Sequence, residues 1–202
     1  PQIVQFYNRL SQSQPIYEGF KSLQVGNEWS NLDLAQKRIA ETNLREAELS
    51  GVGLRGEEKE QFNKIQLELA ELTTKFSNNL LDATKAFELK LTQPQEIEGL
   101  PPSLLSLAAQ TARKKGETEA TAENGPWVIT LNYPSFVPFM KYSTQRPLRE
   151  KLYKAFVTRA SSGDWDNNPL IERILELRSQ QSQLLGYPVS YTHLRAHETE
   201  AD

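Results

Sequence analysis

One apolar stripe in the middle of the chain constrains the fold more than any other feature of the sequence. Between residues 57 and 87, apolar side chains recur at steps of three or four, which places them on one face of a helix. They are Phe62, Ile65, Leu69, Leu72, Phe76, Leu80, Ala83 and Phe87. Gly56 precedes the stripe, and Glu57 and Glu58 lie in the first turn, where the helix dipole favours negative charge. The pattern predicts one long helix with one buried face.

The residues before this stripe predict a second helix that packs against it. Residues 30–49 carry apolar positions at helical spacing, and Ser30 or Asn31 can cap the amino-terminal end. A turn with two glycines follows. We therefore expect a long antiparallel helix hairpin over residues 30 to 87. Further helices are expected at residues 15–26, 100–116, 146–161 and 168–187.

Two short segments depart from the helical pattern. Residues 87–92, FELKLT, alternate apolar and polar side chains, which is typical of a half-buried strand. Residues 126–133, PWVITLNY, are rich in β-branched and aromatic side chains and predict a second strand. Two strands are marginal alone, so we expect them to lie against helices. The predicted fold class is mainly α: a helical lobe with the long antiparallel hairpin and a small two-stranded β element.

Composition limits the class of protein. Of the 202 residues, 38% are hydrophobic, which is enough for a buried core and too many for a disordered charged tail. The formal net charge is −3 and no basic face stands out, so we expect no nucleic-acid partner. No run approaches the roughly 18 apolar residues of a membrane span, so we expect no membrane partner. The absence of cysteine excludes disulfides and thiolate chemistry and suits a cytoplasmic location.

The two histidines of the chain, His193 and His197, are four residues apart and would share one face of a helix. The zinc-peptidase signature needs a glutamate directly after the first histidine, or directly before the second, because that glutamate must reach the metal-bound water. Leu194 and Ala196 occupy those positions, and a signature starting at His197 would need a histidine where Ala201 stands. Two histidines also supply fewer ligands than the three or four of a stable zinc site. We therefore expect no metal site here and interpret the segment as a solvated tail.

The segment DWDNNP resembles a calcium loop, with Asp164, Asp166 and Asn168 at alternate positions. A calcium loop needs glycine at its sixth position and glutamate at its twelfth, and these are Pro169 and Leu175 here. We interpret the segment as a turn that caps the following helix.

Two further segments indicate structure rather than chemistry. The glycines of residues 49–56 lack the lysine and serine or threonine of a phosphate-binding loop, and no serine of the chain lies in a Gly-x-Ser-x-Gly elbow. The aromatic stretch at residues 133–142 could line a peptide groove, but its spacing favours packing against the strands. The residues by themselves predict no catalytic, cofactor-binding or metal-binding residue in this chain.

Long phrases of the sequence, taken in order, resemble one enzyme family. The clearest are GPWVITLNYPSFVPFMKYSTQRPLREKLYKAFVTRASSG, at residues 125–163, and DNNPLIERILELRSQQSQLLGY, at residues 166–187. Together with residues 41–92 and 96–105, they resemble the amino-terminal half of oligopeptidase A, one of the thimet-oligopeptidase-like zinc metallopeptidases.

The resemblance suggests how the chain is organised. It covers nearly everything from Pro1 to Tyr187, and we interpret residues 1–187 as the amino-terminal helical lobe of such an enzyme, truncated at both ends. Residues 188–202, PVSYTHLRAHETEAD, do not match the pattern, look like translated adapter sequence, and are expected to be a disordered or artefactual tail.

The resemblance also implies a mechanism. Members of this family have two helical lobes around a deep channel that admits short peptides and excludes folded proteins. Their catalytic lobe carries His-Glu-x-x-His and a downstream glutamate: two histidines and one glutamate hold zinc, and the motif glutamate activates water. That motif is absent from this chain, so no catalytic position carries over. We therefore expect this chain to form a wall of the channel, to be inactive alone and to bind no metal. Its expected partners are the missing catalytic lobe and, through the channel of the full-length enzyme, short peptides.

Two alternatives stay open. The chain could be a non-catalytic helical interaction module whose hairpin at residues 30 to 87 docks a partner. The tail could also be genuine, with His193 and His197 binding metal, which zinc titration with and without His193→Ala would decide. In either case we expect the chain alone to be only partly stable, because a lobe without its partner leaves apolar surface uncovered.

Overall fold

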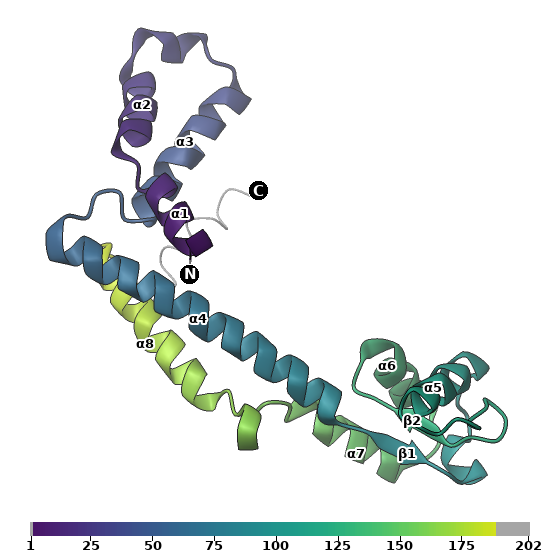
Figure 1. Cartoon of the computed structure of the whole chain (residues 1–202). Coiled ribbons are helices and arrows are strands. Elements are labelled where there is room, and N and C mark those ends of the chain that lie inside the picture. Colours follow the sequence, from purple (N-terminus) through teal and green to yellow (C-terminus); the bar gives the residue numbers. More distant parts are fainter. Residues whose placement is uncertain (1, 189–202) are drawn as a thin grey trace. The chain divides into compact units, whose positions relative to one another are not determined.

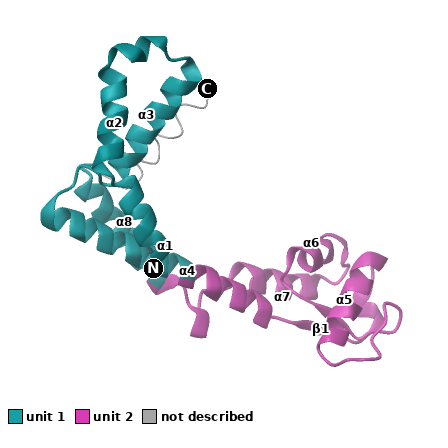
Figure 2. Ribbon diagram, turned by 45° about the horizontal axis from the view of Figure 1, so that its top comes forward, with its two compact units in different colours: residues 1–74, 170–202 teal, residues 75–169 magenta. Residues whose placement is uncertain are grey.

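The computed structural model describes residues 2–188, and this part of the chain is mainly helical with one two-stranded sheet (Figure 1). The prediction of a mainly α chain with a small two-stranded β element is confirmed. The chain divides into two compact units, which are coloured separately in Figure 2. Unit 1 comprises residues 1–74 and 170–202, and unit 2 comprises residues 75–169.

The predicted long helix is α4 (Gly56–Ala86), within one residue of its expected bounds. Its first part belongs to unit 1 and its last part to unit 2. Phe62 and Ile65 on the apolar stripe are buried, as the periodicity predicts. Within residues 2–188, neither this helix nor any other is long and apolar enough to cross a bilayer.

Unit 1 is built from helices. Besides the start of α4, they are α1 (Gln2–Ser11), α2 (Gln14–Val25), the 3-10 helix η1 (Asn27–Asn31), α3 (Leu34–Leu49) and α8 (Asn168–Leu184) from residue 170 onward. Helix α8 buries Leu170 and Leu177, and its Arg173 guanidinium donates two hydrogen bonds to the Glu68 carboxylate of α4. This ion pair joins two segments about a hundred residues apart in the sequence.

The pairing of α3 differs from the expected hairpin. Helix α3 lies beside α2, and in both views it turns away from the axis of α4 (Figures 1 and 2). Gln12 Nε2 donates to Ser50 O at 2.8 Å, and Gln14 Nε2 donates to Val52 O at 2.5 Å. These bonds attach the start of α2 to the residues that follow α3 and accompany the pairing of the two helices.

The amino-terminal cap of α3 is also different from the prediction. Ser30 and Asn31 lie in η1, and the cap is Asp33, whose carboxylate accepts from the Gln36 backbone N–H at 2.8 Å. The Gln36 side chain accepts from the Asp33 backbone N–H at 3.0 Å, which completes a reciprocal capping box. Within α3, Ile39 is 60% exposed, and the buried positions are Ala40 and Leu44.

Unit 2 packs helices around the small sheet. Strand β1 (Leu89–Leu91) pairs antiparallel with β2 (Trp127–Ile129), so that Lys90 lies opposite Val128. The other elements are η2 (Pro94–Ile97), α5 (Pro102–Lys114), α6 (Tyr133–Tyr142), α7 (Arg146–Val157) and η3 (Gly163–Trp165). The core combines Leu91 and Ile129 of the sheet with apolar residues of α5, α6 and α7.

The second strand is shorter than expected because a helix begins where the strand was predicted to end. Asn132 precedes α6, and the Thr130 backbone N–H donates to Ser135 Oγ at 3.0 Å, which turns the chain out of the sheet. Phe136, Phe139 and Met140 then lie on one helical face against the core. The aromatic stretch therefore packs under the strands, as its spacing indicated, but as a helix.

Candidate functional site

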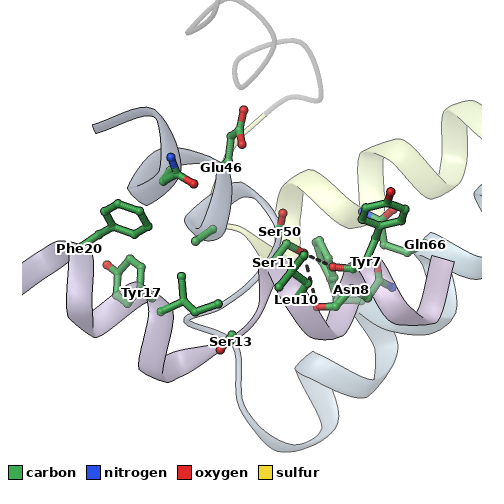
Figure 3. Close-up of a pocket in the computed structure, with 14 residues that line it drawn as sticks. Tyr7, Asn8, Leu10, Ser11, Ser13, Tyr17, Phe20, Glu46, Ser50 and Gln66 are labelled. Atoms are coloured by element: carbon green, nitrogen blue, oxygen red, sulfur yellow. Dashed lines mark hydrogen bonds between the residues drawn. The ribbon is translucent and has the colours of Figure 1, made fainter. Parts of the chain in front are cut away.

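A hollow of about 540 Å³ lies in unit 1 between α1, α2, the end of α3 and the start of α4. Figure 3 shows Tyr17 and Phe20 projecting from α2 at one end, with Tyr7 and Gln66 at the other. Glu46 is the one charged residue among those that line it. A hollow of this size lies within the range of small-molecule sites, and its mixed polar and apolar lining suits binding.

Polar contacts, some of them partly buried, hold the walls of this hollow. Gln12, which is 7% exposed, donates through Nε2 to Ser50 O and to Asn63 Oδ1, both at 2.8 Å. The Ser11 hydroxyl donates to Tyr7 O at 2.9 Å, drawn as a dashed line in Figure 3. The Ser11 hydroxyl is engaged by the helix backbone, and no histidine or lysine lines the hollow to activate a serine there.

One lining residue has a shifted pKa. Tyr17 Oη donates to Glu48 Oε1 at 2.8 Å, and this hydrogen bond to a carboxylate raises the pKa of Tyr17 above its ordinary value of 10.0. The phenol therefore stays protonated at physiological pH and serves as a hydrogen-bond donor. The contact positions the ring of Tyr17.

A second charged cluster joins α4 and α8 in unit 1. Arg173 donates to Glu68 at 2.7 and 3.0 Å and to Glu176 at 2.7 Å. These bonds lower the pKa of Glu68 and raise the pKa of Arg173. The cluster is an ion-pair network between two helices rather than a reactive site.

The predicted capping turn is confirmed. Asp166 Oδ1 accepts from the Asn168 backbone N–H at 3.0 Å and from its side chain at 2.9 Å. Asp164 lies in η3, and Pro169 and Leu175 lie inside α8, where they cannot complete a calcium loop.

His193 and His197, with the rest of the tail, lie outside the described residues, so the predictions about them are not tested. Within residues 2–188, no group of three or more His, Asp or Glu side chains is placed to hold a metal ion.

One buried polar residue beside this turn was missed by the sequence analysis. Asn167 is 3% exposed; its Oδ1 accepts from Asn79 Nδ2 at 2.9 Å, and its Nδ2 donates to Phe76 O at 3.1 Å. Its backbone N–H donates to Ala160 O at 2.8 Å. Asn167 therefore attaches the loop after α7 to the last part of α4. The sequence around it carries no signal for a partner 88 residues away.

Comparison with protein-family models gives two matches. The model described as "Neurolysin/Thimet oligopeptidase, N-terminal domain" matches residues 1–59, and the model described as "Peptidase family M3" matches residues 139–201. The second match includes most of the tail that the sequence analysis set apart, and whether residues 188–202 are native stays a prediction.

Curated proteins match most of the chain. The organellar oligopeptidase A, chloroplastic/mitochondrial, of Arabidopsis thaliana is 52% identical over 187 residues, which are 93% of this chain and 24% of that protein. A probable cytosolic oligopeptidase A of the same plant is 50% identical, with 93% of the chain and 27% of the relative covered. Oligopeptidase A of Escherichia coli K12 is 36% identical over 192 residues, again with 93% and 27% covered. The chain spans about a quarter of the length of these relatives.

Proposed function

The chain belongs to the oligopeptidase A family, and on this basis we propose that it is part of an enzyme that hydrolyses short peptides. The observation that carries the proposal is the 52% identity to an oligopeptidase A over 93% of the chain. Identity at this level, spread over both units, is far beyond what a shared helical pattern produces.

The role proposed for this segment is to form part of the wall of the substrate channel. The mainly helical architecture supports this role, since helices packed in units can build an extended wall. The hollow in unit 1 supports it further, because its lining residues provide binding surface without a histidine or lysine that could act as a base. The reaction itself is assigned to a part of the enzyme outside the described residues.

Zinc, which the family resemblance implies, does not fit the described residues. Among residues 2–188 no group of three or more potential ligands is placed to hold a metal ion, and zinc sites need three or four. We assign the metal, and the water that it would activate, to the catalytic lobe of the enzyme.

A chimera tests the proposal. The matching segment of E. coli oligopeptidase A is replaced by this chain, and cleavage of a quenched fluorescent short peptide is measured. We expect the chimera to cleave the peptide, whereas this 202-residue chain alone does not. A chimera with an unrelated helical segment of the same length is the control. A folded chimera with no more activity than that control would refute the channel-wall role.

One observation favours a second function, that of a non-catalytic interaction module. Helix α1 buries none of its residues, and Ile3, Phe6 and Leu10 on it are 72%, 60% and 49% exposed. Such an apolar face is typical of a docking surface. The two functions differ in what the gene encodes further along: a His-Glu-x-x-His helix supports the peptidase, and a complete reading frame without one supports the module.

The location proposed for the enzyme is the cytosol. One relative is named as cytosolic and another as chloroplastic or mitochondrial, so the family occupies more than one compartment. Cell fractionation followed by immunoblotting with an antibody against this chain would test the proposal, and recovery in organelles alone would contradict it.

A further inference from the structure

A second, shallower hollow of about 300 Å³ lies wholly within unit 2, and it contains an arginine without an anionic partner. Its apolar lining includes the buried Leu131, Phe87 and two alanines of α4, and we call these residues its floor. Its polar lining includes Arg159, Ser162 and Trp165, and we call these residues its rim. We call it the Arg159 hollow.

The guanidinium of Arg159 is held in a fixed position. It lies 3.7 Å from the ring centroid of Phe156, whose ring stacks on Phe136 at 4.0 Å. Its Nε donates to Phe156 O at 2.8 Å, and its Nη1 donates to Thr84 Oγ1 at 3.2 Å. A guanidinium carries five N–H donors in one plane, so these two bonds leave three donors unused. The side chain is therefore oriented before any ligand arrives.

The charge of Arg159 is not neutralised within the part of the chain that the structure describes. No carboxylate of residues 2–188 forms an ion pair with it, whereas Arg173 and Lys154 each have an acidic partner. None of the residues that line the hollow is acidic. A half-buried guanidinium beside aromatic rings is less hydrated than one in open water, so a carboxylate there would gain more from pairing with it.

The rest of the rim supplies hydrogen-bond donors as well. Neither Trp165 Nε1 nor Ser162 Oγ is engaged by another of the described residues, and an indole N–H can only donate. The hollow thus presents a cation and neutral donors above an apolar floor. Its volume lies at the lower end of the range of ligand sites, which suits one amino-acid residue rather than a long segment.

Capping of α7 accounts for part of this arrangement but not for all of it. Arg159 follows the end of α7, and its bond to Phe156 O satisfies one of the carbonyls left open there. That role uses one donor. Capping does not explain why the other N–H donors of Arg159 lie beside an apolar hollow with no acidic side chain among its lining residues.

We propose that the Arg159 hollow binds the carboxyl-terminal residue of a short peptide. Arg159 pairs with the terminal carboxylate, Trp165 and Ser162 donate to it, and the floor receives an apolar side chain. The choice of a peptide as ligand rests on the proposed function. The carboxylate chemistry rests on the hollow alone.

Titration of the ¹⁵N-labelled 202-residue chain with acetyl-Ala-Phe tests this proposal. Binding is followed by NMR at the indole N–H signal of Trp165, which Trp165→Phe identifies. We expect the free acid to bind at least tenfold more tightly than its carboxamide, and to bind more weakly as salt is added. Equal affinity of acid and amide, or no binding of either, would overturn the proposal.

Variants locate the binding to this hollow. Arg159→Gln should weaken binding of the free acid at least tenfold. The control is Arg113→Gln, which should leave this binding unchanged. Arg113 lies outside the hollow and, like Arg159, donates to a backbone carbonyl. Since Arg159→Gln also removes packing on Phe156, a second variant keeps the arginine. Ser162→Glu places a carboxylate on the rim, where it should compete with the ligand for Arg159. We expect this variant to weaken binding of the free acid at least tenfold. Unchanged affinity in both rim variants would refute the site.

A third probe separates two sources of the carboxylate. Acetyl-Glu-Phe-amide offers a side-chain carboxylate and no free terminus. We expect it to bind as weakly as acetyl-Ala-Phe-amide, and binding equal to that of the free acid would reject the terminal carboxylate as the ligand. These experiments measure binding to the chain by itself, so their outcome is independent of whether the chimera cleaves peptides.

Discussion

Replacing Asn167 by alanine should destabilise unit 2 by about 2 kcal/mol. The change removes two side-chain hydrogen bonds, one from Asn79 Nδ2 at 2.9 Å and one to Phe76 O at 3.1 Å, from a residue that is 3% exposed. Each such bond contributes about 1 kcal/mol, and burial prevents water from replacing both partners fully. The backbone bond to Ala160 O survives, so the loop should loosen rather than detach.

The assay can be restricted to unit 2. Trp29 lies in unit 1, whereas Trp127 and Trp165 lie in unit 2, so tryptophan fluorescence in a Trp29→Phe background reports unit 2 during urea unfolding. With a denaturant slope of about 2 kcal/mol per molar, Asn167→Ala should lower the urea midpoint by about 1 M. Asn124→Ala, at an exposed asparagine of the same unit, should change stability by less than about 0.5 kcal/mol.

Two results would refute the reasoning about Asn167. One is a loss for Asn167→Ala no larger than that for the exposed control. The other is strict additivity with Asn79→Ala, because residues that share a hydrogen bond should show a coupling of at least about 0.5 kcal/mol in a double-mutant cycle.

Three further changes have defined outcomes in unit 1. Leu177→Ala removes a side chain that is 1% exposed and should cost about 2–5 kcal/mol in urea unfolding followed by circular dichroism. Asp33→Ala breaks the capping box with Gln36 and should cost about 1 kcal/mol in the same assay. The pKa of Glu68 is lowered by Arg173 from its ordinary value of 4.5, so this carboxylate stabilises the fold above pH 4.5 and loses that effect as pH falls through its folded-state pKa. The melting temperature of Glu68→Gln should therefore change less with pH below 4.5 than the melting temperature of the unchanged chain.

Local patterns predicted α2, α3, α4, α5, α7 and α8, because each pattern is complete within a few turns, but they did not predict α1 or α6. The stripe from Phe62 to Phe87 located α4 within a residue, since burial of one helix face repeats along the segment itself. Asp33 was missed although its signal was present: Asp33 and Gln36 have the spacing of a capping box, which the earlier polar residues Ser30 and Asn31 obscured. Helix α6 was not predicted, because the β-branched and aromatic residues before it favoured continuing the strand.

Contacts between distant segments were not predictable from local pattern. Arg159 meets Thr84 across 75 residues, and Asn167 meets Phe76 across 91. Neither arginine nor asparagine is unusual in its own neighbourhood, and their roles depend on how α4 lies against the loop after α7. The pairing of α3 with α2 is likewise accompanied by contacts between distant residues, in which glutamine side chains reach backbone carbonyls 38 residues away.

The family assignment and the Arg159 hollow depend on different observations, and this makes them separable. The assignment rests on identity to oligopeptidase A, which says nothing about where a peptide would touch this segment. The hollow rests on an oriented guanidinium with unused donors and no acidic neighbour among its lining residues. Salt distinguishes the two contributions of the hollow, since screening weakens a charge pair but hardly affects burial of an apolar side chain. If acetyl-Ala-Phe binds with an affinity that salt does not change, the apolar floor holds the ligand and the charge of Arg159 serves only to cap α7.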